Sequence, residues 1–199
     1  TQQNGIIDED ITWKLSESPF QIVGHVVVAS TASLTIEPGV TVKFDADKAL
    51  EIEGTLIAKG TASDQITFTS SVASPSTSDY WAYIEFDRST SVPATFDGSG
   101  NYLSGSIFEY CSVEYGGSLG KVIEYASYIN QCTFTNNASG IRLAFNQSGT
   151  YYPVKITNSV FSQNNDSNDR DLIAGENGTV KNNTFTDTGN IQLTGANMS

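Results

Sequence analysis

Residues 107–136 read IFEYCSVEYGGSLGKVIEYASYINQCTFTN and contain one short motif twice, as FEYCSVEY and as INQCTFTN. The motif returns as ITNSVFSQ at 156–163 and as VKNNTFTD at 180–187. Imperfect repeats of about 24 residues, built from short β-type runs and polar turns, predict a solenoid. The four copies align in three columns: Phe108, Ile129, Ile156 and Val180; Cys111, Cys132, Ser159 and Asn183; Val113, Phe134, Phe161 and Phe185.

Shorter alternating runs precede these repeats, namely IVGHVVV, LTIEPGVTVKF, LEIEGTLIA and ITFTS between residues 22 and 70. They are rich in Val, Ile and Thr and end at Gly, Pro or Asp, which is typical of β-strands joined by tight turns. Nothing between them has the 3.6-residue period of an amphipathic helix. Leu34 and Leu50 stand 16 residues apart in similar runs, which predicts a first turn shorter than the later ones.

Residues 1–25 do not follow the repeat. A solenoid exposes its core and its strand edges at each open end, so we expect this apolar segment to be an N-terminal cap and 26–199 to be the repeat body of the same domain. The last repeat ends near Leu193 without the composition of a cap. We therefore expect a fragment of a longer protein, whose further domains, or self-association, cover the C-terminal edge.

From Trp13 onward the chain resembles right-handed parallel β-helix proteins of the pectin-lyase-like superfamily, and more closely the extracellular bacterial type. The resemblance is carried by LTIEPGV, LEIEGTLIAKGT, WAYIEF, FEYCSVEYGG and INQCTFTNNASGI. It implies an all-β, single-stranded right-handed parallel β-helix. It implies little about function, because lyases, hydrolases, binding modules and spacers share this repeat. The polygalacturonase-like signatures Asn-Thr-Asp, Asp-Asp, His-Gly and Arg-Ile-Lys do not occur, and the basic residues are scattered along the sequence.

The charge balance narrows the choice of partners. The chain has 22 acidic and 10 basic residues, a formal net charge of −12. Such a field repels nucleic acid and anionic membrane surfaces, and disfavours strongly acidic glycans unless a basic cleft reverses the sign locally. No apolar run approaches the ~20 residues that cross a bilayer, so we expect no membrane insertion. The Ser, Thr, Asn and Gly content is typical of a secreted or cell-surface protein.

Cys111 and Cys132 occupy the same position of consecutive repeats. Stacked turns place equivalent Cα atoms about 4.8 Å apart, which lies within the range for a disulfide. The alternative is a pair of buried thiols in an inward column. The sequence leaves both interpretations open.

Two groups of acidic residues are candidates for chemistry. Outward glutamates on neighbouring turns, Glu85 and Glu114 among them, are candidate acid and base residues of a glycoside hydrolase or lyase, or form a solvated acidic face. Asp166, Asp169 and Asp171 gather in one polar loop with oxygen ligands that Ca²⁺ prefers, although the spacing is not that of a known calcium loop. We expect no required cofactor, and calcium is the one candidate ion.

Exposed aromatic residues suggest a sugar-binding surface. The alternation in WAYIEF predicts Ile84 and Phe86 inward, with Trp81, Tyr83 and Glu85 outward, while Tyr102, Tyr151 and Tyr152 fall in flanking loops. Sugar rings stack on such faces, and carboxylates accept hydrogen bonds from sugar hydroxyls. Alternatively, the insertion at 87–106 folds over Trp81 and buries it.

Three functions follow from these features. The first is a non-catalytic extracellular module that binds a neutral or weakly charged glycan or cell-surface polymer, or serves as a spacer in a larger protein. The second is a polysaccharide-degrading enzyme that uses outward carboxylates. The third is an ice-binding or adhesive surface on Thr-rich strands such as ITFTS. The sequence argues against this function, because outward Thr residues do not form a regular T-x-T array over several turns.

Overall fold

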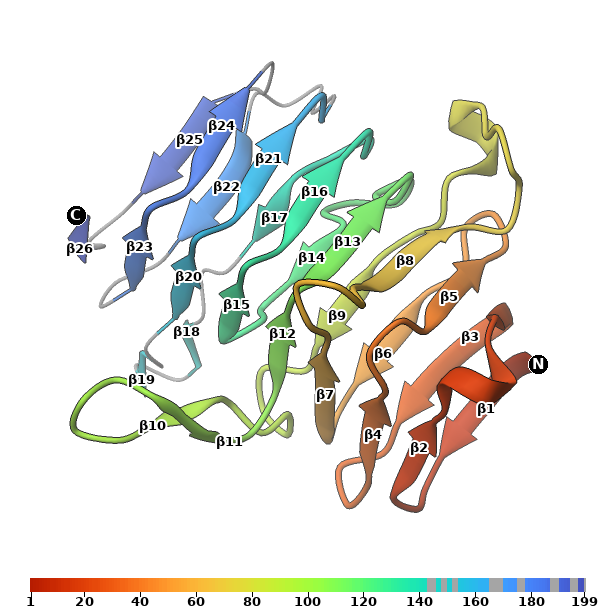
Figure 1. The fold of residues 1–199 in the computed structure, drawn as a ribbon, viewed down its shortest axis with the longest axis horizontal. Coiled ribbons are helices and arrows are strands. Elements are labelled where there is room, and N and C mark those ends of the chain that lie inside the picture. The colour runs from red at the N-terminus through yellow and green to blue at the C-terminus, as the bar shows by residue number, and fades with distance from the viewer. Residues whose placement is uncertain are drawn as a thin grey trace.

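The computed structural model describes residues 1–142, 146–147, 150–151, 154–164, 170–174, 178–186, 190–193 and 197–198. These residues form a parallel β-solenoid of about seven turns, with the strands lying side by side from the N-terminal to the C-terminal end (Figure 1). The prediction of an all-β parallel β-helix is therefore confirmed. Helix is confined, within the described ranges, to the short 3₁₀ segments η1 (Leu15–Glu17) and η2 (Thr77–Asp79). None of the described helices is long and apolar enough to cross a membrane.

The larger sheet has fourteen strands and two arms that meet at β3 (Phe20–Val28). The first half of β3 pairs with β5 and its second half with β6, because the strand serves both faces of the first turn. The β5 arm continues as β5 (Thr41–Phe44), β8 (Ile66–Ser70), β13 (Cys111–Glu114), β16 (Thr133–Thr135), β21 (Val160–Ser162) and β24 (Thr184–Thr186). The β6 arm continues as β6 (Leu50–Ile52), β9 (Ile84–Phe86), β14 (Ile123–Glu124), β17 (Ile141–Arg142), β22 (Arg170–Ala174) and β25 (Asn190–Leu193).

A second sheet forms the remaining face of the solenoid. Its eight strands are β2 (Ile11–Trp13), β4 (Ser33–Ile36), β7 (Thr55–Lys59), β12 (Ile107–Glu109), β15 (Tyr128–Asn130), β20 (Lys155–Thr157), β23 (Thr179–Lys181) and β26 (Asn197–Met198). Two antiparallel hairpins lie outside the turns: β10 (Thr95–Phe96) with β11 (Tyr102–Ser104), and β18 (Asn146–Gln147) with β19 (Thr150–Tyr151). Each full turn thus visits the second sheet, the β5 arm and the β6 arm in that order.

The repeat columns predicted from the sequence are the paired registers of the structure. Phe108 pairs with Ile129, and the same column continues through Ile156 to Val180. The rings of Phe134, Phe161 and Phe185 stack in the core, with centroids 4.9 and 4.8 Å apart. Burial of this continuous apolar column stabilises the solenoid without a separate hydrophobic centre. The expected short first turn is wrong, because Leu34 pairs with Leu56, and Leu50 pairs with Ile84.

Single residues in the left-handed region turn the chain from the second sheet into the β5 arm. Tyr110, Gln131, Asn158 and Asn182 have φ values of 51°, 55°, 55° and 56° at this corner. Asn tolerates that conformation better than most residues, which explains its frequency after the strand ends. The corner repeats in the four turns that begin with β12, β15, β20 and β23, whereas longer links join β4 to β5 and β7 to β8.

The N-terminal segment supplies strands to both sheets. β1 (Gln2–Ile7) pairs with β3, and β2 pairs with β4, so residues 2–13 form the first layer of the solenoid. Trp13 and Phe20 are buried and stack at 4.8 Å. The role of residues 1–25 as a cap remains a prediction.

Candidate ligand-binding groove

The predicted outward orientation of Trp81 is wrong. Its side chain is fully buried and stacks on Phe44, with ring centroids 4.4 Å apart. The indole Nε1 donates a hydrogen bond to the carbonyl oxygen of Glu114 at 2.8 Å. The strand β9 begins only at Ile84, so the alternation of its residues does not extend back to Trp81. Its ring therefore packs in the core and is not offered to a ligand.

Tyr83 and Glu85 do face outward, on the β6 arm, while Ile84 and Phe86 are buried as predicted. The Tyr83 hydroxyl donates to Glu51 at 3.3 Å. Glu85 pairs in register with Glu51 on one side and with Glu124 on the other. Burial, and then the neighbouring charges of Glu124 and Glu51, raise the pKa of the Glu85 carboxyl above its usual value.

The two carboxylates named as catalytic candidates lie on different faces of the solenoid. Glu85 belongs to β9 in the β6 arm, whereas Glu114 belongs to β13 in the β5 arm and accepts a hydrogen bond from Thr69 at 2.9 Å. An acid and a base of a glycosidase flank a single bond. The structure does not bring Glu85 and Glu114 together around one, and Glu85 has carboxylates from neighbouring turns beside it instead.

Replacing Glu85 with glutamine should raise the free energy of unfolding at neutral pH by about 0.5 kcal/mol, because like charges opposite each other destabilise a sheet. The folded-state pKa of Glu85 exceeds the unfolded one, so this carboxyl lowers stability as pH rises from the unfolded pKa through the folded pKa. The gain should therefore vanish below the pKa of an ordinary glutamate. Urea unfolding of the unchanged protein and of Glu85→Gln, at neutral pH and near pH 3, measures this gain in the free energy of unfolding. An equal gain at both pH values would contradict the electrostatic explanation.

The predicted calcium loop cannot be compared with the structure. Asp166 and Asp169 lie outside the described residues, as does the side chain of Asp171. The same holds for Tyr152 and for the side chain of Tyr151. Among the residues that the structure does describe, no group of three or more His, Cys, Asp or Glu is arranged to hold a metal ion.

Cys111 and Cys132 are free thiols, and both are buried. The sulfur of Cys111 lies 3.5 Å from the carbonyl oxygen of Ala58, and that of Cys132 lies 3.3 Å from the carbonyl oxygen of Asn130. Burial raises the pKa of the Cys111 thiol well above its usual value, which disfavours the reactive thiolate. The column continues with Ser159, whose hydroxyl accepts a hydrogen bond from the backbone N–H of Cys132.

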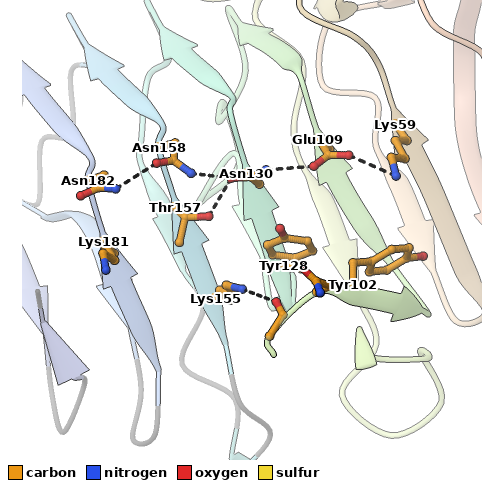
Figure 2. A pocket seen from close by; sticks show the side chains of 12 residues that line it. Lys59, Tyr102, Glu109, Tyr128, Asn130, Lys155, Thr157, Asn158, Lys181 and Asn182 are labelled. Carbon is orange, nitrogen blue, oxygen red and sulfur yellow. Dashed lines mark hydrogen bonds and ion pairs between the residues drawn. The ribbon is translucent and has the colours of Figure 1, made fainter. Parts of the chain in front are cut away.

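A polar groove of about 510 Å³ runs across the outer side of the second sheet, over β7, β12, β15, β20 and β23 (Figure 2). The β10–β11 hairpin forms one of its walls. We call it the lysine–tyrosine groove, and its lining residues are Lys59, Gly100, Asn101, Tyr102, Glu109, Tyr128, Asn130, Lys155, Thr157, Asn158, Lys181 and Asn182.

A chain of side-chain contacts follows the floor of the groove from turn to turn. Lys59 forms an ion pair with Glu109 at 3.4 Å, and the other oxygen of Glu109 accepts a hydrogen bond from Asn130 at 2.9 Å. The Asn130 oxygen accepts hydrogen bonds from Thr157 and Asn158, at 2.7 and 2.9 Å. These bonds hold amide and hydroxyl groups in fixed positions, which lowers the entropy lost when a polar ligand binds.

The hairpin wall is held by aromatic and cationic contacts. The Tyr102 ring stacks near Tyr128 with centroids 6.0 Å apart, and the Tyr102 hydroxyl donates to the carbonyl oxygen of Gly105 at 2.7 Å. Lys155 donates to the carbonyl oxygen of Gly100 at 2.8 Å and lies 5.4 Å from the Tyr128 ring centroid. Burial, and then the charge of Glu109, raise the pKa of both tyrosines, so both phenols are neutral at physiological pH.

The groove is locally basic in an acidic protein. Three of the ten basic residues line it, against one glutamate. Lys59 and Lys155 already have partners in Glu109 and Gly100, while Lys181 is exposed on β23. The basic residues are therefore scattered in the sequence but partly gathered in the fold. The groove can therefore bind a ligand that presents hydroxyl groups along its length and carries one or a few negative charges.

Of the aromatic residues predicted to bind a ligand, the groove contains Tyr102 alone among those whose side chains are described. Sequence reasoning missed Tyr128, Asn130, Lys155 and Lys181. The repeat alignment did carry a signal for part of this set, because Glu109, Asn130, Thr157 and Lys181 each directly follow a residue of the Phe108 column. Nothing in the sequence indicated that the hairpin would lie beside them.

No protein-family model matches the chain. No solved structure matches it either. One stretch of 68 residues is 43% identical to part of Protein bark beetle from Drosophila melanogaster, and it makes up 34% of this chain and 2% of that protein. The chain thus spans only a small fraction of the length of this relative. The likeness covers too little of either protein to assign a family.

Proposed function

We propose that the chain is a non-catalytic glycan-binding module and that the lysine–tyrosine groove is its binding surface. The ligand is a neutral or weakly acidic polysaccharide from outside the cell, bound by a secreted or cell-surface protein. The observation that carries the proposal is the row of fixed hydroxyl and amide groups beside the Tyr102 and Tyr128 rings.

The repeat of the fold supports a polymeric ligand. Paired strands lie about 4.8 Å apart, so a linear polymer along the groove meets a new polar side chain at each turn. The half-buried Tyr102 ring suits the apolar face of a sugar ring, and the buried Tyr128 ring supports it from below. The amides and hydroxyls suit the sugar hydroxyls. Because two of the three lysines already have partners, the groove favours a ligand with few charges over a polyanion.

Replacing Tyr102 with alanine should weaken glycan binding several-fold, because the variant loses the one half-buried aromatic ring on which a sugar can pack in the groove. Tyr102→Phe keeps the ring and should retain most of the affinity, although it loses the bond to Gly105. Tyr83→Ala, on another face, is the matched control and should bind as the unchanged protein does. A glycan array followed by calorimetry on the selected glycan measures these effects.

The same glycans should be assayed for cleavage, with and without Ca²⁺. Binding without release of reducing ends or unsaturated products is the expected result. If the unchanged chain cleaves a glycan and Glu85→Gln does not, the proposal would be wrong and the enzymatic alternative would take its place. Unchanged glycan affinity in Tyr102→Ala would show that the binding site is not the groove. If the chain neither binds nor cleaves any glycan tested, the function of a structural spacer would be favoured.

A further inference from the structure

The outer side of the β5 arm carries two columns of hydroxyl side chains. This hydroxyl face consists of the outward residues of β5, β8, β13, β16, β21 and β24, which are half-buried or exposed. Nine of the twelve are Thr or Ser. One column holds Thr41, Thr67, Ser112, Thr133, Val160 and Thr184, and the other holds Lys43, Thr69, Glu114, Thr135, Ser162 and Thr186.

Most of these hydroxyls are available to a partner. Thr69 donates to Glu114, and Ser162 donates to Thr135 at 3.3 Å. Within the described part of the chain, the hydroxyls of the remaining members form no hydrogen bond with another side chain or the backbone, namely Thr41, Thr67, Ser112, Thr133, Thr184 and Thr186. Each can both donate and accept.

The side chains behind the face repeat one orientation toward its C-terminal end. Behind it, the Phe134 and Phe161 rings lie 3° from parallel, and Phe161 and Phe185 lie 9° from parallel. The three side chains therefore adopt the same orientation on successive turns, as expected where the turns stack in register. In a parallel sheet, positions in register repeat at about 4.8 Å from strand to strand, and outward positions two residues apart repeat at about 6.7 Å along each strand. Hydroxyl groups occupy nine of the twelve positions of the face.

The charge of the face restricts what it can bind. One lysine and one glutamate are its only charged members, so it is neutral in a chain with a net charge of −12. It also has no aromatic residue on which a sugar ring could stack. A neutral, periodic lattice of hydrogen-bonding groups complements such a face, because a rigid lattice engages many weak sites at once.

We propose that the hydroxyl face binds ice. The two columns of hydroxyls take the places of lattice waters, and the threonine methyl groups lie between them. This site is on a different sheet face from the lysine–tyrosine groove and is independent of the glycan-binding proposal. As the sequence indicated, T-x-T pairs do not recur on every turn: they occur on β8, β16 and β24, and each of the three other strands of the face keeps at least one hydroxyl residue in register with them.

The test is thermal hysteresis together with inhibition of ice recrystallisation. The unchanged chain should show both, and Thr135→Tyr should lose most of each, because a large side chain in the middle of the face keeps it from the lattice. Thr35→Tyr, an outward substitution on β4 of the other sheet, is the matched control and should retain both. Far-ultraviolet circular dichroism and urea unfolding show whether each variant is folded.

Absence of hysteresis and of recrystallisation inhibition in the unchanged chain would overturn the proposal. Equal losses in Thr135→Tyr and Thr35→Tyr would assign the effect to another surface and would also overturn it. Glycan binding by Thr135→Tyr should be unchanged. That readout separates a failure of this proposal from a failure of the groove.

Discussion

Replacing Trp81 with alanine should lower the free energy of unfolding by about 3–5 kcal/mol, the usual cost of deleting a buried large aromatic ring. The variant loses the stack on Phe44 and the hydrogen bond from Nε1 to the Glu114 carbonyl oxygen. The variant also leaves a cavity beside Gly116. The indole packs so closely on this glycine that a Cβ atom added there would lie 2.6 Å from the ring. Urea unfolding followed by fluorescence and circular dichroism measures the change.

The neighbouring residue Tyr80 provides the control, because it is half-buried and its ring meets only Tyr115 at 5.7 Å among the described aromatics. Tyr80→Ala should cost clearly less than Trp81→Ala. A Trp81→Ala variant that keeps its stability but loses glycan binding would restore the sugar-stacking role. Such a result would also mean that the indole leaves the core.

Replacing Asn137 with alanine should lower the free energy of unfolding by about 2–4 kcal/mol, because buried polar groups that lose their partners are costly. Asn137 is 1% exposed, and its amide accepts from the backbone N–H of Gly116 at 2.9 Å. Its Nδ2 donates to the Val113 carbonyl oxygen and to Asn164, both at 3.0 Å. Alanine supplies none of these bonds, and the segment after β16 keeps only its other contacts with the turn before it, such as the backbone hydrogen bond from Ala138 to Gly116.

Asn130→Ala is the matched comparison, since Asn130 also links neighbouring turns but lies in the groove in contact with water. Its loss should cost less than about 1 kcal/mol, because water replaces the missing bonds. Urea unfolding of the two variants under the same conditions gives the difference. Equal costs would show that burial does not decide the contribution of these amides.

Much of the fold could be predicted because the later repeats keep one spacing of apolar residues. The columns that begin at Phe108 and Val113 were aligned correctly, since inward residues must stack like on like in a continuous core. The early turns were not aligned correctly. Leu34 and Leu50 have similar neighbours, and the local pattern of apolar residues does not determine which strand each one pairs with. Leu34 pairs with Leu56 instead, 22 residues later.

The candidate site was less predictable, because its parts come from distant segments. Trp81 was assigned to the surface by extending the alternation of β9 beyond the strand, although the chain turns inward there to fill space beside Phe44. Lys59, Tyr102 and Lys181 meet in one groove only through the stacking of turns and the fold of the hairpin. Tyr102 was recognised as a ligand-binding candidate, but its neighbours were not.

The sequence by itself determined that this chain is a parallel β-solenoid, because strand alternation and a repeated column of apolar residues are local, additive signals. Only the tertiary structure decided which outward residues share a face. Insertions of unequal length separate strands that pair, so Thr69 meets Glu114 across 45 residues, while Glu85 and Glu114 lie on different faces. Outward side chains make few contacts that constrain the sequence, and their grouping depends on a register that the buried residues set.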